Sequence, residues 1–109
     1  MGSFKSLFEL AKKEFGKNNR AIHAVQILQE LVKFKKIDGI SWFYYGAALQ
    51  DTGKISEAYN AYQRSEQLLE GDGKGRACVR LGVLKQKLGQ FEKSEFFFKQ
   101  ASELLADPV

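Results

Sequence analysis

The sequence predicts an all-α fold built from short helices in antiparallel pairs. Apolar residues recur at helical spacing along the chain, and no stretch shows the sustained two-residue alternation of a strand. The only proline is Pro108, so almost the whole chain is free to be helical. Most of the ten glycines are grouped where helices would stop. Short connections between short helices imply that neighbours run antiparallel.

Each expected helix combines an apolar stripe with residues that favour helix ends. Gly16 and the Asn18-Asn19 pair separate the first two helices, and Gly53 and Gly89 end two later ones. Asp38-Gly39 and Gly71-Asp72-Gly73 supply the remaining breaks. The expected helices cover about 4–15, 20–35, 41–52, 56–70, 76–88 and 91–105.

The helices also repeat in pairs. A shift of 36 residues carries one set of positions onto another, and a shift of 37 relates the first pair to the second less closely. The pairs related by 36 are Gly46 and Gly82, Gly53 and Gly89, Ala58 and Ser94, Tyr62 and Phe98, Ser65 and Ala101, and Leu68 and Leu104. The chain is therefore expected to hold three helical hairpins.

Close packing accounts for the glycines that recur inside the helices. Gly46 and Gly82 lie in the middle of expected helices, where each costs about 1 kcal/mol against alanine. That cost is tolerable where a partner helix fills the space, and the rings of Tyr62 and Phe98 have the right size. We expect each glycine to pack against its aromatic partner.

These positions resemble the tetratricopeptide repeat, with its Trp, Leu-Gly, Tyr, Ala, Phe and Ala signature. One motif comprises Trp42, Tyr45, Gly46, Leu49, Gly53, Ala58, Tyr62, Ser65 and Leu68, and a second comprises Leu81, Gly82, Gly89, Phe98, Ala101 and Leu104. The resemblance implies one domain over 1–109, with repeats at about 1–38, 39–72 and 75–108, in a short right-handed superhelix. Both spacings exceed the family's 34 residues, so extra residues are expected in the loops around Asp38 and Gly73.

The resemblance also implies a binding surface. Members of the family hold peptides or helices in a concave groove lined by the first helix of each pair. The corresponding positions, expected to give an apolar floor and a charged rim, are Phe43, Ala47, Gln50, Asp51, Arg76, Val79, Val83, Gln86 and Lys87. The alternative is that Phe43 and Val79 simply bury against their neighbours.

A second contact surface is expected on the last helix. Phe96 shares a helical face with charged residues and should be exposed, whereas Phe97 can face inward. With Leu105 and a final apolar face that no polar helix covers, Phe96 and Phe97 suggest a second contact surface or a homodimer.

Composition favours binding over chemistry. His23 and Cys78 are the only residues of their types, so neither a multi-cysteine metal site nor an internal disulfide is expected, and we expect Cys78 to face the interior. No nucleophile elbow, phosphate loop or acidic pair is evident, so neither an enzyme nor a bound cofactor is expected.

No apolar run is long enough to span a membrane. The Met1-Gly2-Ser3 start fits a loose myristoylation pattern, but a cytoplasmic protein without a lipid anchor is the expectation.

We therefore expect a module that binds a segment or helix of another protein, as an adaptor, a co-chaperone or a secretion chaperone. An immunity protein that blocks a toxin or enzyme is one alternative. The other is a basic nucleic-acid-binding domain, which the net charge of +4 makes possible but which the interspersed acidic residues disfavour.

Overall fold

The computed structural model describes residues 21–31, 33 and 38–105, and within these residues every regular element is an α-helix. The helix expected over 4–15 and both ends of the one expected over 20–35 lie outside the described residues. The helices are α2 (Ala21–Leu31), α3 (Gly39–Asp51), α4 (Ile55–Leu68), α5 (Gly71–Lys87) and α6 (Phe91–Leu105). The all-α hairpin fold is confirmed for this part of the chain.

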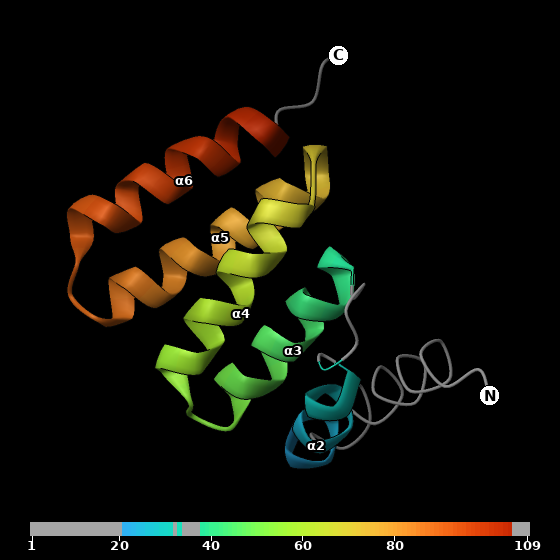
Figure 1. Ribbon diagram of the computed structural model, residues 1–109. Coiled ribbons are helices and arrows are strands. Elements are labelled where there is room, and N and C mark those ends of the chain that lie inside the picture. The colour runs from blue at the N-terminus through green and yellow to red at the C-terminus, as the bar shows by residue number, and fades with distance from the viewer. Residues whose placement is uncertain (1–20, 32, 34–37, 106–109) are drawn as a thin grey trace.

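The helices are stacked in chain order (Figure 1). The closest neighbours are α3 with α4 and α5 with α6, the two helices of each hairpin. The hairpins are joined because α4 packs against α5, and α2 packs against α3 in the same way. The expected right-handed superhelix and the division of 1–109 into three repeats stay predictions.

The start of α3 shows how local chemistry sets a helix boundary. Asp38 is the N-cap, and its Oδ1 accepts a hydrogen bond from the backbone N–H of Ser41 (2.8 Å). The helix therefore begins at Gly39, two residues before the expected start. The hydroxyl of Ser65 on α4 donates a hydrogen bond to the carbonyl oxygen of Gly39 (2.8 Å), which ties the two helices of the hairpin together.

The prediction for the start of α5 is wrong. The expected break at Gly71-Asp72-Gly73 is instead the first turn of the helix, so α5 has 17 residues where α3 has 13. The chain turns at Leu69 and Glu70, which have extended backbones, and Gly71 follows with a φ of 60°. The extra residues of the repeat therefore lengthen α5 rather than a loop. A glycine costs a helix only about 1 kcal/mol, which packing can offset.

The glycine–aromatic packing is confirmed in both hairpins. A β-carbon built on Gly46 would lie 2.8 Å from Cδ1 of Tyr62, and one built on Gly82 would lie 2.7 Å from Cε1 of Phe98. Real β-carbons essentially never come so close to another heavy atom. The missing side chains allow each helix pair to approach closely.

A second glycine contact repeats in the same way. A β-carbon on Gly39 would lie 2.6 Å from Cγ of Leu69, and one on Gly75 would lie 2.7 Å from Cγ of Leu105. The α3–α4 and α5–α6 hairpins thus each have two glycines seven residues apart on the first helix. The first glycine of each pair was not recognised from the sequence as a packing residue, because it lies at an expected helix end, where glycine is common.

The core runs continuously through the hairpins. Leu28 of α2, Leu49 of α3, Tyr62 of α4 and Leu81 of α5 are all fully or almost fully buried. Burial decreases toward the last hairpin, where Phe91 of α6 keeps 66% of its surface exposed. Of the helices that the structure describes, none has both the length and the apolar character that crossing a membrane requires.

Candidate functional site

The first half of the expected binding surface lies on one face of α3. Phe43, Ala47, Gln50 and Asp51 are spaced by helical turns, so their side chains share that face. Ala47 is buried, Phe43 and Gln50 are half-buried and Asp51 is exposed. Asp51, the last of the four, is therefore the most exposed.

The second half lies on one face of α5. Val79 and Val83 are half-buried, and Arg76, Gln86 and Lys87 around them are exposed. The two valines are thus less exposed than the charged and polar residues around them. We call the nine residues on α3 and α5 the α3–α5 face. That this face binds anything stays a prediction.

One contact joins the two halves. The guanidinium of Arg80 on α5 lies 5.7 Å from the centre of the Phe43 ring on α3, a cation–π distance. The Phe43 ring also meets the Tyr62 ring edge-to-face at 5.4 Å between centres. Phe43 thus packs partly into the core, as the alternative interpretation held, and its outer side is next to a positive charge.

Arg80 was missed by the sequence reasoning. It lies one turn after Arg76 and one turn before Leu84, a position that periodicity assigns equally well to the edge of the face or to solvent. Only the stacking of the two hairpins, in which α5 packs against α4, brings its guanidinium to Phe43. With Arg76 and Lys87, Arg80 makes the α5 side of the face basic.

A hydrogen bond fixes the polar end of the face. The hydroxyl of Tyr62 donates to Oε1 of Gln50 (3.0 Å), so the amide nitrogen of Gln50 keeps its two donors for other partners. Burial raises the pKa of Tyr62 to about 12; Arg80 opposes this shift and Asp51 adds to it. Tyr62 is therefore a neutral donor at physiological pH, and the face offers mainly hydrogen-bond donors and positive charge.

Two of the three residues expected to form a second contact surface lie side by side, because the Phe96 and Phe97 rings are 5.7 Å apart between centres; that they form a contact surface stays a prediction. Phe96 is 58% exposed, as expected. Phe97 is half-buried because its ring meets Tyr59 of α4 at 6.4 Å between centres. Leu105 packs on Gly75 at the far end of the hairpin. Phe97 is therefore part of the packing between α4 and α6, and Phe96 lies beside it.

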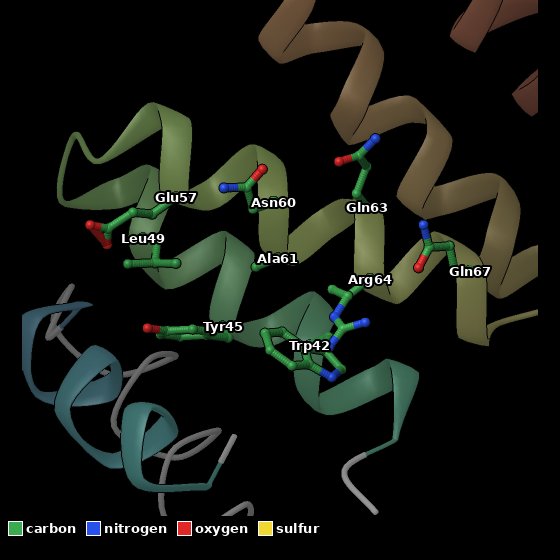
Figure 2. A pocket seen from close by; sticks show the side chains of 9 residues that line it. All are labelled: Trp42, Tyr45, Leu49, Glu57, Asn60, Ala61, Gln63, Arg64 and Gln67. Atoms are coloured by element: carbon green, nitrogen blue, oxygen red, sulfur yellow. The ribbon is translucent and has the colours of Figure 1, made fainter. Parts of the chain in front are cut away.

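The structure also has a hollow that the sequence did not indicate (Figure 2). It lies on the flank of the α3–α4 hairpin beside α2 and has a volume of about 460 Å³. Aromatic rings form its floor, and the guanidinium of Arg64 lies 5.5 Å from the centre of the Trp42 ring. Its lining consists of Trp42, Tyr45, Leu49, Glu57, Asn60, Ala61, Gln63, Arg64 and Gln67.

The repeat identifies this hollow as a packing surface. A shift of 36 carries Leu49 to Lys85 and Ala61 to Phe97. On the last hairpin, the equivalent surface at Lys85 and Phe97 is covered by Tyr59, which belongs to α4 of the preceding hairpin. The centre of the Tyr59 ring lies 4.3 Å from the Lys85 ammonium nitrogen and 6.4 Å from the centre of the Phe97 ring. The hollow of the middle hairpin is thus the surface on which the second helix of a preceding hairpin packs. It is less filled than its counterpart in the last hairpin because Ala61 stands where that hairpin has Phe97.

Within the described residues, the structure has a buried cysteine and no cluster of metal-ligating side chains. Cys78 is fully buried, as expected, and burial, with a smaller effect of Glu66, raises the pKa of its thiol. No group of three His, Cys, Asp or Glu side chains lies together there in the way that a metal site needs. The side chain of His23 lies outside the described part of the chain.

Comparison with known families gives one match. Residues 75–106 match the family model of the tetratricopeptide repeat, and the match covers most of α5 and all of α6. No curated protein shows significant similarity to the sequence.

Proposed function

Because residues 75–106 form a tetratricopeptide repeat, we propose that this chain is a protein-interaction module that binds a peptide segment or helix of another protein on its α3–α5 face. The observation that carries the proposal is the Arg80–Phe43 contact, which joins the first helices of two hairpins into one surface. A partly apolar strip with polar edges suits one side of an extended segment or amphipathic helix.

The charges of the face favour an acidic partner. Arg76, Arg80 and Lys87 line the α5 side, and Asp51 is the one acidic residue among the nine positions of the face. The donors of Gln50 add to this preference, because the carbonyl and carboxylate oxygens of a peptide are acceptors. The partner would determine whether the module acts as an adaptor, a co-chaperone or a secretion chaperone.

A peptide-display selection against the intact chain tests the proposal. We expect the selected peptides to combine acidic and apolar residues and to bind less tightly to the Val79→Asp variant, by about tenfold or more, because a carboxylate would enter the apolar strip. Val79 is a better target than Phe43, because truncating Phe43 would also remove its packing on Tyr62. Circular dichroism would show that helicity is retained.

A matched pair of charge reversals locates the site. Lys87→Glu on the α3–α5 face and Lys99→Glu on α6 make the same chemical change at two exposed positions. We expect only Lys87→Glu to weaken binding, and more so at low salt. Equal loss in both variants, or no loss with Val79→Asp, would contradict the proposal. Retardation of nucleic acid that fades steeply with salt would instead favour the basic nucleic-acid-binding alternative.

A further inference from the structure

One hydrogen bond distinguishes equivalent positions of the two hairpins. A shift of 36 residues carries Gln50 to Gln86 and Tyr62 to Phe98. The hydroxyl of Tyr62 donates to Oε1 of Gln50 (3.0 Å), whereas Phe98 has no hydroxyl to donate. Gln50 is half-buried, and Gln86 is exposed. Both glutamines belong to the α3–α5 face, but within the described part of the chain a tyrosine holds only the first.

Burial decides which way round the Gln50 amide lies. Tyr62 is fully buried, and within the described residues the acceptor of its hydroxyl is Oε1 of Gln50. If the amide turned over, its nitrogen would face the hydroxyl, and the buried hydroxyl hydrogen would lose its acceptor, which is costly. The oxygen of Gln50 is therefore kept toward Tyr62. The nitrogen, with two N–H donors, is kept on the side away from the hydroxyl.

Opposite charges act on this end of the face. Burial is the main reason for the raised pKa of Tyr62, while the positive charge of Arg80 lowers that pKa and the negative charge of Asp51 raises it. Arg80 reaches this place through its contact with the Phe43 ring, and Asp51 follows Gln50 in the chain. Because the two charges oppose each other, the surroundings of the amide suit a neutral acceptor. Every peptide segment carries such acceptors in its main-chain carbonyl oxygens.

We propose that the amide nitrogen of Gln50 donates to a main-chain carbonyl of the bound segment and that Tyr62 is the residue that positions it. The inference rests on the proposed peptide binding on the α3–α5 face. A donor that is already held loses less side-chain freedom on binding than the exposed amide of Gln86 would lose. A main-chain contact is also independent of the segment's sequence, so the charges on α5 are left to select its side chains.

Nuclear magnetic resonance of the free chain tests the positioning without any ligand. We expect the order parameter of the Gln50 side-chain amide to exceed that of Gln86, because only Gln50 is held. Tyr62→Phe keeps the ring that packs on Gly46 and should lower the Gln50 value to that of Gln86. Equal order parameters in the natural chain, or an unchanged Gln50 value in Tyr62→Phe, would overturn the positioning role.

Peptide binding by matched variants tests the donor. Gln50→Leu should raise the Kd of a display-selected peptide by about fivefold or more, and Gln86→Leu, the same change at an amide that is not held, should raise it less. Tyr62→Phe should weaken binding in the natural chain but have no further effect in a Gln50→Leu chain, because it acts through Gln50. Circular dichroism would show that helicity is retained. Equal losses for the two glutamines, or an equal effect of Tyr62→Phe in both chains, would overturn the inference.

A neutral form of the same peptide identifies the acceptor. Replacing its Asp and Glu residues by Asn and Gln, with an amidated C-terminus, removes the carboxylates and keeps the main-chain carbonyls. We expect Gln50→Leu to weaken binding of this peptide by the same factor. A loss of the effect would show that Gln50 binds a carboxylate instead, and would overturn the inference. If no peptide binds the natural chain, the proposed function fails as well, whereas peptides that bind but do not respond to Gln50→Leu refute the inference alone.

Discussion

The β-carbon that Gly46 lacks would lie 2.8 Å from Cδ1 of Tyr62, and the same relationship holds between Gly82 and Phe98. The two hairpins differ at most other positions, but in both a glycine lets the two helices pack closely. Tyr62 of the first pair is fully buried, whereas Phe98 of the second is half-buried. The two sites therefore show the same contact at two degrees of burial.

Gly46→Ala should destabilise the protein by about 1–3 kcal/mol in the free energy of unfolding, because the Tyr62 ring must move within a filled core. Gly82→Ala should cost less, because the half-buried Phe98 ring can shift toward solvent. Chemical denaturation followed by circular dichroism measures both. A larger loss for Gly82→Ala than for Gly46→Ala would contradict the expected effect of burial.

Gly73→Ala is the matched control for those two substitutions. Gly73 is also helical, but its β-carbon position is 3.4 Å from Cδ1 of Leu69, an ordinary van der Waals distance. Alanine should therefore fit there and stabilise the protein by up to about 1 kcal/mol through helix propensity. The same denaturation experiment should give the opposite sign from Gly46→Ala.

Two buried serines should respond in opposite directions to the same change. Ser65→Ala removes the hydrogen bond to the Gly39 carbonyl and should cost about 1 kcal/mol. The buried Oγ of Ser41 has no hydrogen-bond partner in the described part of the structure, and Ala77 stands at the position 36 residues later. Ser41→Ala should therefore be neutral or stabilising. Equal losses in the two variants would contradict this assignment.

The repeat and its packing could be predicted from the sequence because a glycine inside a helix, at a fixed distance from an aromatic residue, indicates close helix packing. The start of α5 could not, because Gly71-Asp72-Gly73 favours a break locally, whereas the structure takes these residues into the first turn of the helix. The role of Arg80 was missed for a related reason. Its contact with Phe43 depends on how two hairpins stack, which periodicity within one helix does not specify.

Cys78 should be inert in the folded protein. Its thiol is fully buried, lies 3.9 Å from Oε1 of Gln100, and has a raised pKa, so little thiolate forms at neutral pH. Labelling with a thiol reagent should be slow in buffer and rise sharply across the denaturant unfolding transition. Rapid labelling of the native chain would show that α5 and α6 separate far below that transition.

Alkaline pH should weaken the fold through Tyr62. Its pKa is about 12 in the folded state against the ordinary 10.0, chiefly because burial disfavours the phenolate. The stabilisation is complete below about pH 10 and is lost as the pH rises toward 12, where the unfolded chain has released the proton and the folded chain still holds it. The loss is at most about 2–3 kcal/mol. Tyr45 and Tyr59, whose pKa values are also raised, add to it in the same direction.

Comparing Tyr62→Phe with the natural chain isolates the Tyr62 contribution, because the other groups titrate in both. The variant should lose less stability between about pH 9 and pH 12, and identical slopes would show that Tyr62 ionises freely in the fold.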